Sequence, residues 1–183
     1  MIDIKKRRRL GVTNYHKRIA LLKSGMPRVV VRKSNRAVKL QIIAYTPTGD
    51  KVLASANSRE LTEYGWSPRC NIPTAYLTGM LLAGKAKSIK KEAFIPDIGL
   101  YRPVKSSVAF AAIKGCMDNG LKIPGTIEMD GAKITGKAIK DYAQKISAKG
   151  GNKTQFSKYA KDKFDVSKID EAFESVKKKI ASK

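Results

Sequence analysis

The most regular apolar pattern lies in the first third of the chain, where it predicts three short strands in succession. The run from Arg28 to Lys33 is short and β-branched, which favours a strand. Apolar and polar residues then alternate from Arg36 to Tyr45 and again from Lys51 to Asn57. Ser34-Asn35 and the segment from Thr46 to Asp50 have turn composition. We therefore predict a three-stranded antiparallel meander.

The pattern changes after Asn57 and predicts a helix, a strand and a second helix. Residues 58–73 are predicted to form a loop, and Thr74 is predicted to cap a helix that runs to about Ile89. Ala93 to Ile95 is predicted as a short buried strand that Pro96 ends. Ser106 or Ser107 then caps a second helix, and Gly120 provides its C-terminal stop. The order predicts an α/β fold with an antiparallel start and a βαβ-like second half.

Both ends of the chain lie outside this core pattern. Residues 1–27 form a basic arm with a short helix around Leu21, residues 28–123 form the α/β core, and residues 124–183 form a lysine-rich helical extension. In the extension, a helix is predicted to start near Asp130 or Gly131, and residues 149–152 read as a linker. Ser167 is predicted to cap a last helix whose apolar positions, Ile169, Phe173, Val176 and Ile180, have helical spacing.

The high positive charge of the chain indicates an anionic partner. The chain has 38 Lys and Arg residues against 15 Asp and Glu residues, a formal net charge of +23. Thirteen of these cations lie between Lys5 and Lys39, where there is no acid. Like charges at this density repel each other unless a polyanion neutralises them. Tyr15, His16 and Asn14 lie among them, and cations interleaved with ring and amide groups favour RNA.

A basic tail or a membrane surface accounts for this charge less well than RNA does. A solubilising or targeting tail would not explain why the basic character continues into the predicted core. An anionic membrane surface also attracts cations, but no apolar run approaches the roughly 18 residues that span a bilayer. No apolar segment of a signal peptide follows the basic start, so we expect a cytosolic protein. Cys70 and Cys116 have no ligand-type neighbours, so we expect reduced, buried thiols and no metal or other cofactor.

Three motifs hint at catalysis without completing a site. Residues 79–86 nearly match a phosphate-binding P-loop, but Ala86 replaces the hydroxyl residue that would hold Mg²⁺, and the small residues there favour close helix–sheet packing. Asp97, Asp118 and Glu92 could hold Mg²⁺ in a nuclease, although no two of them are close in sequence. Asp97 is otherwise expected to form the turn before Gly99 or to pair with Arg102. His16 has no partner for acid–base work.

Arginine and aromatic residues also occupy the two long loops of the predicted core. Arg69 lies in the first loop, and Tyr101, Arg102 and Lys105 lie in the second. Arginine and aromatic side chains on loops of a basic fold favour RNA contact. Trp66 has two equal interpretations, an RNA contact or a seal at the rim of the core.

Several segments resemble one known family. They include Arg7 to Tyr15, Pro27 to Asn35, Tyr64-Gly65-Trp66, Asn71 to Gly79, Pro96 to Leu100 and Ala112 to Leu121. Together they resemble the archaeal form of the universal large-subunit ribosomal protein that is numbered eighteen in the bacterial scheme. The motifs cover roughly Arg7 to Pro124, and residues 136–143 resemble the extension of archaeal and eukaryotic members.

The resemblance implies a ribonuclease H-like fold of the translational-machinery type, without enzymatic activity. It implies a place in the central protuberance, where the protein ties 5S rRNA to the large rRNA beside neighbouring large-subunit proteins. A magnesium-dependent RNA-processing enzyme and a general RNA chaperone are the alternative functions. The candidate RNA-binding residues are Lys5, Lys6, Arg7, Arg8, Arg9, Asn14, Tyr15, His16, Lys17 and Arg18 in the arm, Arg28, Arg32, Lys33, Ser34, Asn35 and Arg36 on the first strand and its turn, and Arg69, Tyr101, Arg102 and Lys105 in the loops.

Overall fold

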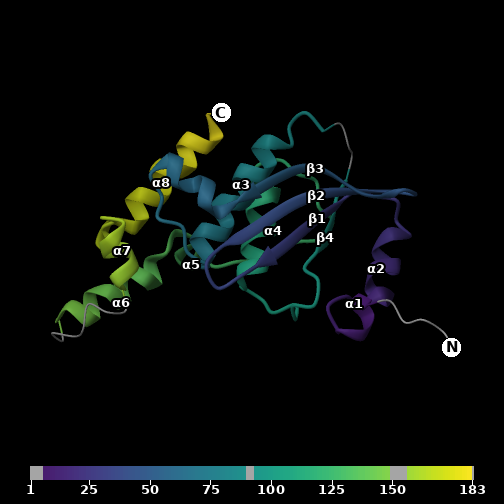
Figure 1. Cartoon of the computed structure of the whole chain (residues 1–183). Coiled ribbons are helices and arrows are strands. Elements are labelled where there is room, and N and C mark those ends of the chain that lie inside the picture. The colour runs from purple at the N-terminus through teal and green to yellow at the C-terminus, as the bar shows by residue number, and fades with distance from the viewer. Residues whose placement is uncertain (1–5, 90–92, 149–155, 183) are drawn as a thin grey trace.

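The computed structural model describes residues 6–89, 93–148 and 156–182, so Lys5, Glu92 and the predicted linker at 149–152 lie outside the described residues. A mixed sheet lies at the centre, with the basic arm and the C-terminal helices at opposite ends (Figure 1). The elements are α1 (Lys6–Arg9), α2 (Tyr15–Leu22), β1 (Arg28–Lys33), β2 (Val38–Thr46), β3 (Gly49–Asn57), the 3-10 helix η1 (Ser58–Tyr64), α3 (Ile72–Lys85), β4 (Ile95–Asp97), α4 (Val108–Asp118), α5 (Gly131–Thr135), α6 (Lys137–Ala148), α7 (Ser157–Lys161), the 3-10 helix η3 (Val166–Lys168) and α8 (Ile169–Ala181).

The strands are ordered β3-β2-β1-β4 in the described sheet. β1 pairs antiparallel with β2, and β2 pairs antiparallel with β3, which confirms the predicted meander. β4 returns after α3 and pairs parallel with β1, which confirms a mixed α/β fold. Val29 and Val31 of β1 are fully buried because α4 packs on the face to which they point.

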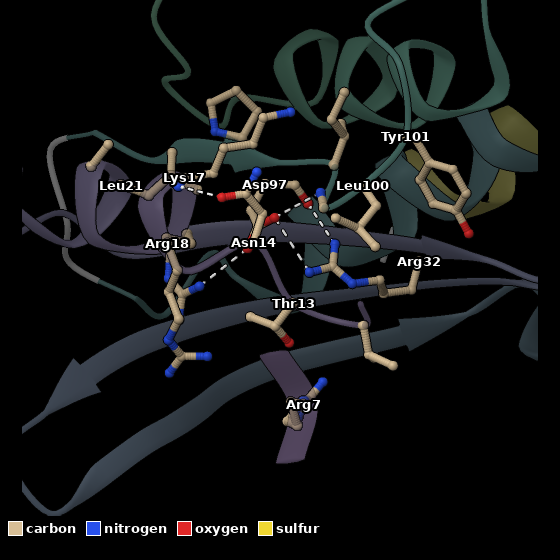
Figure 2. A pocket seen from close by; sticks show the side chains of 16 residues that line it. Arg7, Thr13, Asn14, Lys17, Arg18, Leu21, Arg32, Asp97, Leu100 and Tyr101 are labelled. Atoms are coloured by element: carbon tan, nitrogen blue, oxygen red, sulfur yellow. Dashed lines mark hydrogen bonds and ion pairs between the residues drawn. The ribbon is translucent and has the colours of Figure 1, made fainter. Parts of the chain in front are cut away.

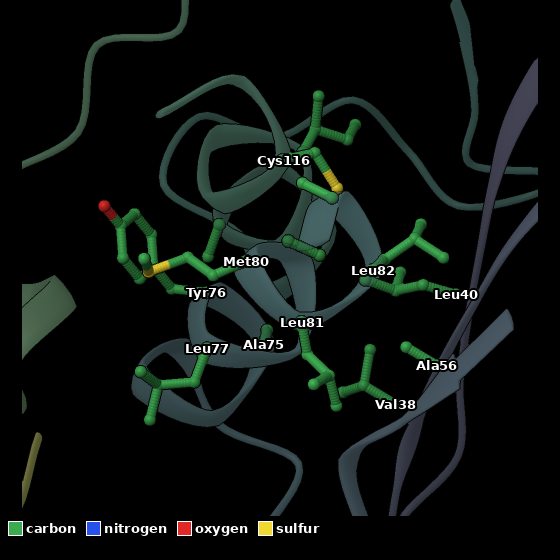
Figure 3. Packing of buried hydrophobic residues seen from close by; sticks show 14 of the residues in the cluster. Val38, Leu40, Ala56, Ala75, Tyr76, Leu77, Met80, Leu81, Leu82 and Cys116 are labelled. Carbon is green, nitrogen blue, oxygen red and sulfur yellow. The ribbon is translucent and has the colours of Figure 1, made fainter. Parts of the chain in front are cut away.

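The core lies between the sheet and helix α3. Leu40 and Val38 of β2 face Leu81 and Leu82 of α3 (Figure 3). Every residue of α3 from Pro73 to Ala83 is buried, because the sheet, α4 and α8 surround this helix.

Two glycines let α3 and α4 approach each other closely. A Cβ built on Gly79 would overlap the carbonyl oxygen of Ala112, and one built on Gly115 would overlap that of Tyr76. The glycine that opens the P-loop-like segment therefore allows a close approach to a helix, whereas the sequence predicted a close approach to the sheet. The segment itself is helical and forms no phosphate-binding loop.

Helix α8 completes the same core. Its predicted apolar positions Ile169, Phe173, Val176 and Ile180 are all buried, which confirms the helical spacing. The ring of Phe173 lies 6.3 Å from that of Trp66 and 5.8 Å from that of Tyr76. The C-terminal segment is thus packed against the centre of the fold and shares its hydrophobic core.

Several predicted boundaries in the core were wrong. Residues 58–64 form η1 instead of a loop, because Asn57 and Glu60 make a capping box. Asn71, and not Thr74, caps α3, which ends at Lys85. Strand β4 includes Pro96, which an edge strand tolerates because one side of it needs no backbone donor. Ser107 caps α4, as one of the two predicted alternatives.

Two predictions for the extension also needed correction. Gly136 has a φ of +88° and divides the predicted single helix into α5 and α6. Ser167 caps nothing, since it lies inside η3, and the side chain of Asp165 caps that turn instead. Helix α8 then begins without a side-chain cap hydrogen bond.

Candidate nucleic-acid interface

The described part of the arm offers its cations to solvent. Lys6, Arg7, Arg8 and Arg9 of α1 are exposed, and α2 contains no buried residue. Asn14 caps α2, because its Oδ1 accepts a hydrogen bond from the backbone N–H of Lys17 at 3.1 Å. His16 and Lys17 are exposed on the same helix, and Tyr15 is half-buried.

A chain of alternating charges joins the arm to the sheet. Asp50 Oδ2 lies 2.7 Å from Nη2 of Arg18 and 3.0 Å from Nη2 of Arg28. Asp97 Oδ2 lies 3.1 Å from Nη1 of Arg28, and its Oδ1 lies 3.3 Å from Nη2 of Arg32. We call these five residues the arginine–aspartate chain; it connects α2, the start of β3, both ends of β1 and the end of β4.

The middle of the arginine–aspartate chain is buried. The side chains of Arg28 and Asp97 are 5% and 8% exposed, whereas those of Arg18 and Arg32 are 36% and 46% exposed. Removing either partner of a buried ion pair leaves an uncompensated charge in a site with little water. Arg28 and Asp97 therefore hold the geometry of this face, while Arg18 and Arg32 remain accessible to a ligand.

The loop after β4 is fixed against β1 by further hydrogen bonds. Arg32 Nη1 donates to the backbone oxygen of Asp97 at 2.9 Å, and Asp97 Oδ1 accepts from the N–H of Gly99 at 2.8 Å. The φ of Gly99 is +66°, and a Cβ there would meet the Arg32 guanidinium at 3.0 Å, so glycine suits this position. Tyr101 donates its hydroxyl to the backbone oxygen of Lys33 at 2.7 Å, and the Lys33 ammonium lies 5.2 Å from the Tyr101 ring centre.

These elements enclose a groove of about 840 Å³ between the arm and the loop after β4. Figure 2 shows Lys17 and Arg18 of the arm on the left and Arg32, Leu100 and Tyr101 on the right. Asn14 and Asp97 lie between the two sides, and Arg7 lies below. Five of the described lining residues are Arg or Lys, whereas Asp97 is the one acidic residue among them. The groove is therefore cationic, and we call it the arm groove.

The other candidate residues near β1 lie outside the arm groove. Lys33, Ser34, Asn35 and Arg36 are exposed at the turn between β1 and β2, where Ser34 Oγ accepts from the N–H of Ala37 at 3.1 Å. Arg102 and Lys105 are exposed on the loop beyond Tyr101. These exposed residues do not line the arm groove.

Arg69 lies apart from this face. Its Nη2 donates to Asp162 Oδ2 at 2.6 Å, and its guanidinium lies 4.9 Å from the ring centre of Tyr159. Hydrogen bonds from Ser67 and Arg69 lower the pKa of Asp162, while burial raises the pKa of Tyr159. Arg69 thus binds the C-terminal segment to the core.

Trp66 belongs to the core. Its side chain is 1% exposed, and its indole N–H donates to Oγ1 of Thr74 at 2.9 Å. Of its two interpretations, the structure supports the seal at the rim of the core and contradicts the RNA contact.

The carboxylates considered for a magnesium-dependent nuclease do not come together among the described residues. No group of three or more His, Cys, Asp or Glu residues among them could hold a metal ion. Of the two roles expected for Asp97, the turn before Gly99 is confirmed, because its Oδ1 accepts from the Gly99 N–H. Its ion-pair partners are Arg28 and Arg32 instead of Arg102. Asp118 accepts from the Tyr76 hydroxyl at 2.8 Å and pairs with Lys114 at 3.0 Å.

Sequence reasoning missed the role of Asp50 and the apolar part of the groove. Asp50 is the first acid after Asp3, and a lone acid after a long basic segment is a signal for an ion pair that orders the arginines. Leu100 and Val12 line the groove but carry no charge, so the pattern of basic residues does not reveal them. The cysteines are both free, with Cys116 buried and Cys70 half-buried.

None of the helices within the described ranges is long and apolar enough to cross a membrane.

Comparisons with known proteins agree on one family. The family described as ribosomal large subunit proteins 60S L5 and 50S L18 matches residues 3–94. The large ribosomal subunit protein uL18 of Korarchaeum cryptofilum is 44% identical over 180 residues, which cover 97% of this chain and 92% of that protein. The uL18 proteins of Thermofilum pendens and Ignicoccus hospitalis are 46% and 42% identical, over 96% of this chain and 92% and 89% of their own lengths.

These matches define the class as a large-subunit ribosomal protein, which is a structural and non-enzymatic class. The chain belongs to the uL18 family in its archaeal form, as its motifs suggested. The matches to the archaeal relatives extend over nearly the whole chain, including the C-terminal segment that shares the core.

Proposed function

We propose that this chain is a structural constituent of the large ribosomal subunit that binds 5S rRNA and attaches it to the large rRNA in the central protuberance. One observation carries the proposal: basic side chains from α1, α2 and β1 surround a single groove, and the carboxylates of Asp50 and Asp97 fix the arginines among them. The archaeal uL18 relatives support the ribosomal part of the proposal. Its site of action is then the ribosome in the cytoplasm, beside the neighbouring proteins of the protuberance.

The arm and the strand have different tasks in this proposal. The cations of residues 1–27 neutralise phosphates, which adds affinity for any RNA. Arg32 and the turn residues up to Arg36 are attached to a rigid sheet, so they recognise one RNA shape. Arg28 is buried between two aspartates, so it contributes to RNA binding by holding the neighbouring residues in place. The core of residues 28–123 thus provides specificity, and residues 124–183 stabilise it.

The proposal also includes a finer relationship of the fold. A meander followed by helix, strand and helix, with β4 parallel to β1, is compatible with the ribonuclease H-like arrangement of translational-machinery proteins. We include that relationship in the proposal. A nuclease is not supported, because the described carboxylates that would hold Mg²⁺ are engaged with cations or hydroxyl groups.

RNA that co-purifies with the protein from its native source tests the proposed function. The protein is isolated at about 150 mM salt, and the bound RNA is sequenced and compared with total RNA. We expect enrichment of 5S rRNA together with large-subunit rRNA fragments. A general RNA chaperone would retain RNAs in proportion to their abundance, and that result would contradict the proposal.

A further inference from the structure

The arm groove combines three properties that a simple phosphate-binding surface does not need. It is recessed, it has cations at its rim, and part of its wall is apolar. Its volume of about 840 Å³ lies within the range of roughly 300–1,000 Å³ that is usual for ligand pockets. A flat basic patch would be enough to hold the backbone of an RNA duplex, so the recess and its apolar wall call for a separate explanation.

The apolar wall comes from both sides of the groove. Leu21 of α2 lies on one side of the groove and Leu100 on the other, with Asn14 and Asp97 between them (Figure 2). Ile98 of the loop after β4 also lines the groove. Leu100 is 55% exposed and Val12 is 53% exposed, although both lie in the most basic region of the molecule. Both side chains line the same recess, and an apolar lining with a few polar groups is typical of ligand-binding grooves. They offer a surface on which a flat ring can pack.

Polar groups lie beside this wall. Asn14 uses Oδ1 to cap α2, which leaves its Nδ2 donor without a partner among the described residues. The exposed guanidinium of Arg32 lies next to Leu100, and Lys17 and Arg18 lie opposite (Figure 2). Cations around a partly apolar recess suit a ligand with an anionic group outside and an aromatic ring inside.

We propose that the arm groove holds one unstacked nucleotide of the bound RNA, with its base against Leu100 and its phosphates at Lys17, Arg18 and Arg32. Bases of single-stranded loops and bulges are recognised in this way, whereas bases within a duplex stay stacked. This inference deepens the proposed function and rests on it, since it names the part of the RNA that the same face binds. The arm forms one wall of the site, so the Arg18–Asp50 ion pair helps to form it.

A pair of matched variants tests the site. Leu100→Ala removes the apolar wall, and Val104→Ala makes a similar change at a residue that is 57% exposed on the same loop but does not line the groove. Neither variant changes charge. Partial burial of the lost carbon groups beneath a base predicts roughly tenfold weaker binding of 5S rRNA by Leu100→Ala. Val104→Ala should bind as the wild type does, in gel shifts at about 150 mM salt.

A second experiment identifies the base directly. 5S rRNA is prepared with 2-aminopurine at single unpaired purine positions, and its fluorescence is measured with and without protein. The wild type should change the fluorescence of one position strongly, and Ala20→Phe, which narrows the groove, should abolish that change. Ile19→Phe should preserve it, because Ile19 is exposed on the same helix and does not line the groove.

The outcomes separate this inference from the proposed function. If the wild type binds 5S rRNA and both Leu100→Ala and Val104→Ala bind it as tightly as the wild type does, the groove holds no base. That result would instead fit a neighbouring protein's side chain as the occupant. If the wild type itself shows no preference for 5S rRNA, the proposed function fails, and the nucleotide site fails with it.

Discussion

Replacing Asp97 by Asn tests whether the arginine–aspartate chain holds the binding face. The substitution keeps the shape of the side chain and an oxygen that can accept from Gly99 N–H. It removes the charge that faces Arg28, whose side chain is 5% exposed. Breaking a buried pair from one side typically costs about 3–5 kcal/mol. Since Arg28 keeps Asp50 at 3.0 Å, we expect a loss near the lower limit, about 3 kcal/mol in the free energy of unfolding.

Urea denaturation of the free protein measures this loss, and Asp50→Asn is the matched comparison. Asp50 carries the same charge in the arginine–aspartate chain, but its side chain is 24% exposed. Ion pairs near the surface contribute roughly 0–1 kcal/mol, so Asp50→Asn should cost about 1 kcal/mol. If Asp97→Asn costs no more than Asp50→Asn, the buried pair does not hold this face together.

The same variant separates charge from geometry in RNA binding. Asp97→Asn removes one negative charge beside a cationic groove, so a purely electrostatic surface would bind every RNA more tightly. Arg32 also loses the carboxylate that directs its guanidinium. We therefore expect the preference for 5S rRNA over an unrelated RNA to fall even if total affinity rises. An unchanged preference would show that the direction of Arg32 is irrelevant.

Three further predictions concern other parts of the molecule. Gly79→Ala should destabilise the protein by about 3 kcal/mol or more in urea denaturation, because its Cβ would overlap the Ala112 carbonyl, whereas Gly84→Ala should be nearly neutral since its nearest neighbour lies 4.0 Å away. Deleting residues 1–10 should leave the fold intact and reduce the salt dependence of RNA binding; a full salt slope would contradict the role of the arm. Burial raises the pKa of Cys116 from 9.0 to about 12, so the unfolded thiol ionises first and stability should fall as pH rises above 9; Cys116→Ala should show a shallower fall.

Local sequence patterns were sufficient for the three antiparallel strands and for the existence of α3, α4 and α8. The β-branched run of β1 and the apolar–polar alternation of β2 are local patterns, and β1 and β2 pair directly with each other. Both strands were therefore predicted at nearly their observed positions. The errors occurred where a capping interaction or a backbone dihedral angle decides the boundary of a helix. Asn57 with Glu60 forms η1, and the φ of Gly136 divides α5 from α6, and neither is visible as apolar periodicity.

The composition of the candidate site could be predicted, but its arrangement could not. The basic residues of the arm and β1 were evident from their charge density alone. Their order depends on Asp50 and Asp97, which reach the same arginine from positions 22 and 69 residues away in the sequence. Arg69 looked equivalent to the other loop arginines, and only its contact with Asp162, 93 residues further on, assigns it to the core. Contacts over such distances follow from the fold and have no local signal.

Competition gel shifts with Arg32→Ala/Asn35→Ala test the central claim most directly. The measured quantity is the affinity ratio between 5S rRNA and an unrelated RNA of equal length at about 150 mM salt. Because the sheet holds these two residues in place, we predict that the variant loses 5S rRNA binding more than binding of the unrelated RNA, while the deletion of residues 1–10 weakens both evenly. Equal losses for both RNAs in the double variant would mean that the strand contributes charge alone, which would contradict a rigid face that recognises 5S rRNA.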